Sequence, residues 1–270
     1  MTGFVLRIIA MVTMLIDHVA CNLLNAGTLS TVMRSIGRLA FPIYAFLLAE
    51  GFLIFYKDKD RVMKHISSLI VLIVASEFFY DLMECGLEFS KYFESQNNIL
   101  TLFLGFLGML ITEKLFPRDK KNKKDIRSIF VLASSYLLLG FANYMIKGNF
   151  NIVGPWLVIA YYWFIRACRD AKTNENTWKW GKRFVILLLI FVVYIPIYFW
   201  AKKSFCGFDL WIQTMKDYIP WIIGHVGAAL VLSFYNGKQG YHKKWFKRLY
   251  VSFYPLHACI IGIIRVIIGH

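Results

Sequence analysis

Acidic residues are scarce in this chain, and so are charged residues in general. Its 270 residues include 16 Asp and Glu against 31 Lys and Arg, and only 17% carry a charge. With 58% hydrophobic residues, this composition excludes an ordinary soluble domain. Five cysteines exclude a disulfide framework, although a single bridge between Cys85 and Cys206 stays an alternative. Strand-type alternation is absent, which argues against a transmembrane β-barrel.

Long apolar segments dominate what is present. A helix rises about 1.5 Å per residue, so roughly 20 apolar residues cross the hydrocarbon layer of a bilayer. Residues 1–270 therefore predict an all-α bundle of about nine transmembrane helices in one integral-membrane domain. The predicted spans are 4–24, 36–56, 65–83, 98–116, 126–146, 152–166, 183–201, 218–235 and 249–268.

The basic residues are distributed unevenly along the chain. They follow every even-numbered span, as Lys57, Lys59, Arg61 and Lys64 do after the second, whereas the connection after the third is acidic. The positive-inside rule places the basic connections in the cytoplasm. We therefore expect a multi-pass protein of the cell membrane, with its N-terminus in the cytoplasm and its C-terminus outside.

Asp17 and His18 lie side by side inside the first apolar segment. An ionisable pair at membrane depth is costly, so it normally faces the protein interior and has a function. Later spans contain further ionisable residues. This pattern predicts a polar reaction chamber buried in the membrane.

Depths counted at about 1.5 Å per residue separate these residues into two layers. His18, at about 20 Å from the cytoplasmic side, belongs to an outer layer. A second layer lies about 10 Å from that side. The outer layer comprises His18, Arg38, Glu77, Asp81, Asn98 and His225, and the inner layer comprises Glu50, Tyr254 and His257.

Each candidate also has a structural interpretation. Adjacent helical residues point about 100° apart, so Asp17 does not orient the His18 ring and could instead be the counter-ion of Arg38. His18 could make an interhelical hydrogen bond instead of acting as a base. Glu77 and Asp81 could hold helices together through Arg34 or Arg38. A glycine follows Glu50 and could form a packing notch, and glycines flank His225, which indicates close helix approach.

Two motifs are distinctive: the Ile-Asp-His of residues 16–18 and the block Gly-Arg-Leu-Ala-Phe-Pro-Ile-Tyr-Ala-Phe-Leu-Leu-Ala-Glu-Gly of residues 37–51. A resemblance to the TraX family rests on these motifs. It continues through Ser-Glu at 76–77, with an aspartate four residues later, and ends with Tyr-Pro-Leu-His at 254–257. The founding member of this family acetylates the N-terminus of conjugative F-pilin. The family is also distantly similar to membrane acyltransferases that acetylate sugars.

The resemblance implies a membrane-embedded acetyltransferase that uses cytoplasmic acetyl-CoA as co-substrate, with no metal. Its acceptor would be an amine or a hydroxyl, on a peptide N-terminus or a glycan, in a chamber that opens outward. Membrane lipids are expected partners and nucleic acids are not; the oligomeric state stays open. We assign catalysis to His18, Asp17, Arg38, Glu77, Asp81 and Asn98, and cofactor binding to Glu50, Lys57, Lys59, Arg61, Lys64, Tyr254 and His257.

In this mechanism His18 is the general base, since its usual pKa of about 6.5 suits proton transfer near neutrality. Arg38 or Asn98 stabilises the developing oxyanion. A histidine-acetyl intermediate is a second route. Two other classes compete with the enzyme: a proton-coupled transporter or lipid flippase, and a non-catalytic assembly factor of a pilus or secretion system.

Overall fold

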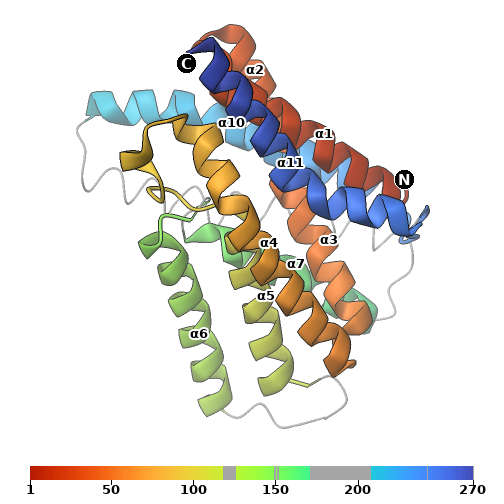
Figure 1. Ribbon diagram of the computed structural model, residues 1–270. Helices are drawn as coiled ribbons and strands as arrows, with labels where there is room; N and C mark the ends of the chain where they lie inside the picture. Colours follow the sequence, from red (N-terminus) through yellow and green to blue (C-terminus); the bar gives the residue numbers. More distant parts are fainter. Residues whose placement is uncertain (118–125, 149, 151, 171–207, 242, 270) are drawn as a thin grey trace. The chain divides into compact units, whose positions relative to one another are not determined.

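The computed structural model describes residues 1–117, 126–148, 150, 152–170, 208–241 and 243–269. Within these ranges the structure is helical, with no strand and one isolated β-bridge between Gln96 and Gly148. The all-α prediction is confirmed. The helices (Figure 1) are α1 Gly3–Asn22, α2 Thr28–Gly37, α3 Ala40–Phe55, α4 Lys59–Cys85, η1 Phe89–Lys91, α5 Asn98–Leu115, α6 Ile126–Met145, α7 Val153–Asp170, α10 Phe208–Ser233 and α11 Lys244–Ile268.

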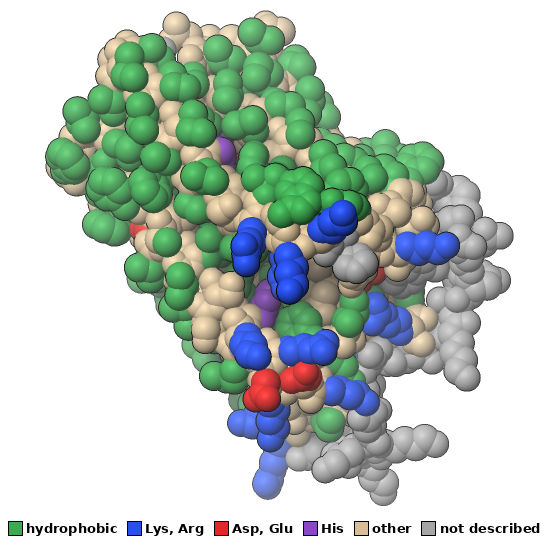
Figure 2. All heavy atoms as spheres, turned by 45° about the vertical axis from the view of Figure 1, so that its right-hand side comes forward, with side chains coloured by type: hydrophobic (Ala, Val, Ile, Leu, Met, Phe, Trp, Pro, Cys, Tyr) green, Lys and Arg blue, Asp and Glu red, His purple; other side chains and the backbone are tan. Residues whose placement is uncertain are grey.

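Six described segments are long and apolar enough to cross a membrane. They are α1, the α2–α3 segment Thr28–Phe55, α4, α5, α6 and α11. Large apolar side chains on them are exposed, such as Phe130 at 73% and Leu138 at 66% on α6, and hydrophobic side chains cover wide areas of the visible surface (Figure 2). Such a surface is favourable against lipid, so the chain is a multi-pass membrane protein. The count of nine spans and their orientation stay predictions.

Two sequence predictions involve residues that the structure does not describe. One is the seventh predicted span, 183–201, all of which lies outside the described residues. So does Cys206, the expected partner of Cys85. The disulfide therefore stays a prediction.

The second span differs from its predicted bounds. It begins at Thr28 rather than at residue 36, and its helix is interrupted between α2 and α3. At the interruption Leu39 N donates to Ile36 O at 3.2 Å, a shorter turn than the α-helical one. The cause is Pro42, which has no N–H for the carbonyl of Arg38 and whose ring crowds that carbonyl. Arg38 thus lies at a break inside the segment.

The described chain forms two compact units. The first unit combines Met1–Tyr44 with Cys168–His270, and the second is Ala45–Ala167. The first therefore contains α1, α2, α10 and α11, and the second contains α4, α5, α6 and most of α3 and α7. The prediction of a single domain over 1–270 stays a prediction.

In the first unit α1 and α11 run side by side in the same direction (Figure 1). Their contacts follow the same order along both helices: the Phe4 ring lies 4.6 Å from the Phe246 ring, and Asn22 Oδ1 accepts from Arg265 Nη1 at 3.2 Å near the other ends. α11 continues as a helix through Pro255. This parallel pairing fixes which residues of α1 and α11 meet.

Aromatic side chains fill the core of the second unit. The Phe52 ring of α3 lies 5.3 Å from Phe106 of α5 and 5.8 Å from Tyr162 of α7. Glycines let the helices approach: a methyl group at Gly105 would overlap Val158 across the α5–α7 contact. These helices therefore pack closely around one apolar centre.

Candidate functional site

The predicted site residues are divided between the two units. The first unit contains five of them and the second contains the other eight. The first group is Asp17, His18, Arg38, Tyr254 and His257. The second group is Glu50, Lys57, Lys59, Arg61, Lys64, Glu77, Asp81 and Asn98. The single chamber shared by all of them stays a prediction, and each group is described by itself.

Two buried histidines meet in the first unit. His18 Nδ1 of α1 lies 2.6 Å from His257 Nε2 of α11, and the ring planes are nearly parallel at 11°. The residues are 6% and 3% exposed. Tyr254 points its ring edge-on to both, with centroid distances of 6.3 Å to His18 and 5.4 Å to His257. The two imidazoles therefore form one hydrogen-bonded pair inside the helix bundle.

This pair corrects the two-layer prediction for the first unit. The sequence predicts His257 and Tyr254 in an inner layer, well below His18, whereas the structure places all three together. The error came from the start of α11, which begins at Lys244 rather than at 249. From Lys244, His257 lies about 20 Å along its helix, close to the depth of His18 along α1.

An ion pair lies one residue before His18. Asp17 Oδ2 is 3.6 Å from Arg38 Nη1, and their side chains are 14% and 16% exposed. Asp17 Oδ1 is buried and has no hydrogen-bond partner among the described residues. The Arg38 guanidinium also lies over the Trp221 ring of α10, 4.6 Å from its centroid. The counter-ion role that the sequence analysis considered for Asp17 is therefore present.

Two glycines allow neighbouring helices to approach these charged residues, Gly37 at Asp17 and Gly224 at Arg38. A methyl group at Gly37 would overlap Asp17 Cβ, and one at Gly224 would overlap Arg38 Cβ. The close helix approach predicted around His225 is confirmed at Gly224. Gly37 was not predicted as a contact point, because it is next to Arg38 in sequence and its opposing residue is on another helix.

Three further residues of the first unit contact the candidate residues or one another and were not predicted as parts of the site: Trp221, Asn22 and Arg265. Trp221 stacks on His225 at 5.8 Å, and its backbone oxygen is 2.9 Å from His225 Nδ1. Asn22 donates to the carbonyl of His18 at 2.9 Å and accepts from Arg265 at 3.2 Å. The spacing of four residues between Trp221 and His225, and between His18 and Asn22, was a usable signal, because such residues share a helix face.

In the second unit Glu77 and Asp81 bind the connection between α4 and α5. Glu77 is 8% exposed and accepts from the side chain and backbone N–H of Asn97. Asp81 is 1% exposed and accepts from Phe93 N at 3.3 Å. Glu77 Oε1 has no hydrogen-bond partner within the described ranges. The sequence predicts Arg34 or Arg38 as partners of Glu77 and Asp81. The described partners are instead N–H groups of Asn97 and Phe93 in this connection.

Asn97, one residue before the candidate Asn98, binds Glu77 and caps α5. Asn97 is the N-cap of α5: its Oδ1 accepts from Ile99 N at 3.0 Å, and its Nδ2 donates to Ile73 O at 3.2 Å besides Glu77. Asn98 is the first residue of the helix itself. The signal for Asn97 was its place before an apolar run, where asparagine favours the N-cap.

The predicted cofactor residues of the second unit lie at and after the end of α3. Glu50 is half-buried in α3, and a methyl group at the following Gly51 would meet none of the described atoms within 4 Å. No described residue therefore packs into the notch that the sequence predicts at Gly51. The other residues are exposed around the start of α4, where Asp58 caps the helix: Lys57, Lys59, Arg61 and Lys64. Their cofactor role stays a prediction.

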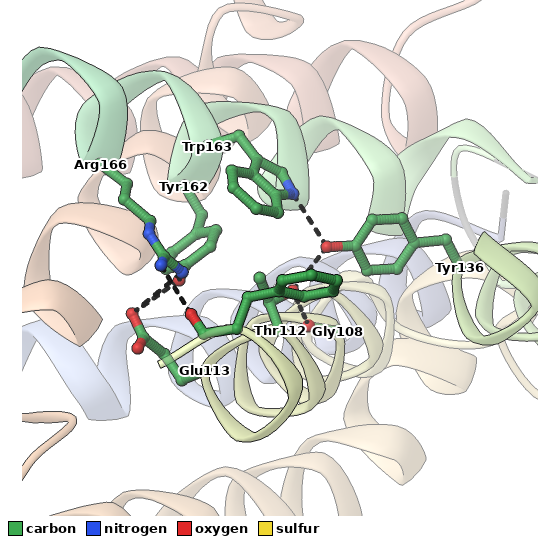
Figure 3. Close-up of polar contacts among 8 residues, drawn as sticks. Gly108, Thr112, Glu113, Tyr136, Tyr162, Trp163 and Arg166 are labelled. Carbon is green, nitrogen blue, oxygen red and sulfur yellow. Dashed lines mark hydrogen bonds and ion pairs between the residues drawn. The ribbon is translucent and has the colours of Figure 1, made fainter. Parts of the chain in front are cut away.

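A further buried cluster joins α5 and α7 (Figure 3). Tyr162 and Arg166 point toward Glu113: Tyr162 Oη donates to Glu113 Oε1 at 2.6 Å, and Arg166 Nη1 donates to Tyr162 Oη at 2.8 Å. Arg166 Nη2 also donates to the carbonyl of Phe116 at 2.6 Å, just after the last residue of α5. Beside it, Trp163 donates to the Tyr136 hydroxyl at 2.9 Å. Through Arg166 the cluster satisfies a backbone carbonyl at the C-terminal end of α5. The sequence did not predict this cluster.

The family model described as TraX protein matches residues 2–265. The chain belongs to the TraX family. Its resemblance to that family, deduced from the motifs at residues 16–18 and 37–51, is thus confirmed.

A curated relative of this TraX-family chain is the probable fimbrial assembly protein FimC, serogroup H1, of Dichelobacter nodosus. The two are 26% identical over 168 residues, which cover 60% of this chain and 63% of the relative. The match thus spans less than two thirds of that protein. No solved structure matches the chain.

Proposed function

We propose that this TraX-family protein is a membrane acetyltransferase that moves an acetyl group from cytoplasmic acetyl-CoA to an amine or hydroxyl acceptor. The observation that supports this function is the buried His18, hydrogen-bonded to His257 and adjacent in sequence to the Asp17–Arg38 ion pair. Polar and charged groups are expensive at membrane depth and are retained there mainly for function. A transmembrane helix that needs only to pack would carry apolar residues at these positions.

The chemistry follows from what these side chains can do. A neutral imidazole at His18 accepts the proton of an attacking amine or hydroxyl, which makes the acceptor a stronger nucleophile. The Arg38 guanidinium has five N–H donors and stabilises the negative charge that develops on the thioester oxygen. Asp17, 3.6 Å from Arg38, holds that guanidinium in place.

The acceptor in this proposal is the amino group of a fimbrial or pilus subunit. Support comes from the name of the relative, a probable fimbrial assembly protein. Such subunits pass through the cell membrane, so we place the enzyme there. A glycan hydroxyl is the alternative acceptor of the same chemistry.

The relative's name also favours a second candidate, a membrane protein that assists fimbrial assembly without catalysis. The two candidates differ in what His18 does. An assembly factor needs His18 only for packing, so acetyl transfer would be absent from the wild-type protein.

The deciding experiment uses membranes that contain the full chain, radiolabelled acetyl-CoA and a fimbrial subunit. Wild-type protein should transfer label, and His18→Ala should lower the rate by about 100-fold or more, the usual contribution of a general base. Val12→Ala is the matched control, because Val12 is on the same helix and 49% exposed. Absence of label with wild-type protein, or full activity of His18→Ala at normal folding, contradicts the proposal.

A further inference from the structure

The proton positions on His257 follow from its neighbours. His257 Nδ1 lies 2.8 Å from the backbone oxygen of Phe253. A carbonyl oxygen only accepts hydrogen bonds, so Nδ1 carries a proton and donates it. In a neutral imidazole the other nitrogen then has a lone pair. His257 Nε2 is therefore an acceptor, and it faces His18.

The same logic sets the proton on His18. Its Nδ1 is 2.6 Å from His257 Nε2, and two lone pairs at that distance would repel. His18 Nδ1 therefore donates, which leaves the lone pair of His18 on Nε2. The order of donation is His18 Nδ1–H to His257 Nε2, and His257 Nδ1–H to the Phe253 carbonyl.

The surrounding rings hold this geometry. Phe253 stacks on His257 at 5.1 Å and 14°, and Tyr254 packs edge-on to both imidazoles. Asn22 binds the His18 carbonyl from the adjacent turn at 2.9 Å. Flipping either ring would break hydrogen bonds that water cannot replace inside an apolar bundle.

We propose that His257 is a positioning residue that fixes His18 in the tautomer whose Nε2 is the base for acetyl transfer. This inference rests on the proposed function, and it replaces the cofactor-binding role that the sequence suggested for His257. When His18 becomes an imidazolium, its Nδ1–H still donates to His257 Nε2, and this hydrogen bond to a charged group is stronger than the neutral one.

The proton and bond changes balance without any further reactant. His18 Nε2 takes the proton from the neutral amine or hydroxyl as the acceptor atom attacks the thioester carbonyl carbon. The carbon–sulfur bond then breaks with its electron pair going to sulfur. His18 Nε2–H returns the proton to that thiolate, which leaves as the thiol, and the neutral tautomer is restored.

Three substitutions of His257 separate positioning from packing. His257→Phe keeps an aromatic ring beside His18 but has no acceptor. His257→Gln places an amide oxygen where Nε2 was, and His257→Asn is too short to reach His18. We expect kcat to fall about 100-fold or more in the Phe and Asn variants and to recover largely in the Gln variant. The KM for acetyl-CoA should change little in all three.

Histidine nitrogen NMR of the full chain in bilayers gives a second measurement that does not depend on activity. With all six histidines labelled, His18→Ala identifies the His18 signals by their loss. Wild-type His18 should show a protonated Nδ1 and an unprotonated Nε2, and His257→Phe should lose this preference. A protonated Nε2 in the neutral wild-type ring overturns the inference, even where a variant fails to fold.

The outcomes separate this inference from the proposed function. An active His18→Ala removes the function itself. An inactive His18→Ala with a fully active His257→Phe leaves the function and overturns only the role of His257. A raised KM for acetyl-CoA with unchanged kcat in His257→Phe also overturns it, because that result assigns His257 to cofactor binding.

Discussion

The two units use buried polar residues differently. In the first, His18 and His257 bond to each other through their side chains across two helices, and Arg38 lies at a break within a membrane segment. In the second, Glu77, Asp81 and Arg166 bind backbone or capping groups at helix ends and connections. Helix ends leave backbone groups unsatisfied, so polar side chains there stabilise the fold. The hydrogen bond between His18 and His257 instead joins two side chains, and it satisfies no backbone group at a helix end.

We therefore expect the proposed chemistry to depend on the first unit, whereas Glu77, Asp81 and Arg166 stabilise the second; the catalytic roles that the sequence predicts for Glu77 and Asp81 are the alternative. Substitutions in the second unit should therefore lower stability and spare activity per folded molecule. Substitutions around His18 should lower activity at little cost in stability. The outcomes below test this division.

The largest stability effect is expected at Glu113. Glu113→Ala leaves the buried Arg166 without the carboxylate that lies 3.7 Å from it. Breaking a buried ion pair in this way costs about 3–5 kcal/mol of the free energy of unfolding. Unfolding in detergent measures the loss, and acetyl transfer per folded molecule should be unchanged.

The double variant Glu113→Leu, Arg166→Met is the matched control. It removes both charges, so most of the lost stability should return. A Glu113→Ala protein that is stable but inactive would break the comparison, because the second unit would then carry chemistry.

A smaller effect is expected where α1 and α2 meet. Gly37→Ala places a methyl group against Asp17 Cβ and forces the helices apart, at a cost of about 1–3 kcal/mol in stability. Because Asp17 and Arg38 shift with it, the acetyl-transfer rate should fall by more than the folded fraction does. A methyl group at Gly51 meets no described atom within 4 Å, so Gly51→Ala should change neither measurement. Equal effects of the two substitutions would contradict the contact.

The smallest effect is expected at the start of α5. Asn97→Ala removes the N-cap, which costs about 1 kcal/mol, and also removes the side-chain donor to Glu77. Activity per folded molecule should persist. Asn98→Ala is the matched comparison one residue later: a stable but inactive Asn98→Ala protein would support the catalytic role predicted for Asn98 and extend the chemistry into the second unit.

Much of the architecture could be predicted from the sequence. The lengths of apolar segments follow from bilayer thickness, and the described helices occupy eight of the nine predicted segments. Helix boundaries were less accurate, as at Lys244 and Thr28, because amphipathic ends extend a helix beyond its apolar run. An error of five residues at α11 displaced His257 by about 7 Å and put it in the wrong layer.

The candidate site was predicted less completely than the fold. His18, Asp17 and Arg38 stood out because each is ionisable inside an apolar segment. Trp221 and Asn97 did not stand out, because an aromatic or amide residue is common in or beside an apolar segment. Their roles become visible only when their neighbours in the structure are known. Asn97 carries the capping signal, and only the structure adds its contact with Glu77.

The sequence by itself determined that the chain is helical, lies in a membrane and places ionisable residues in it, because these properties depend on local composition and on the length of each apolar run. The tertiary structure alone decided that His18 meets His257, which is 239 residues away, and that Gly37 lies against Asp17 and Gly224 against Arg38. Such pairings depend on which helices become neighbours and in which register. That register comes from the summed packing of many side chains, and no single segment encodes it.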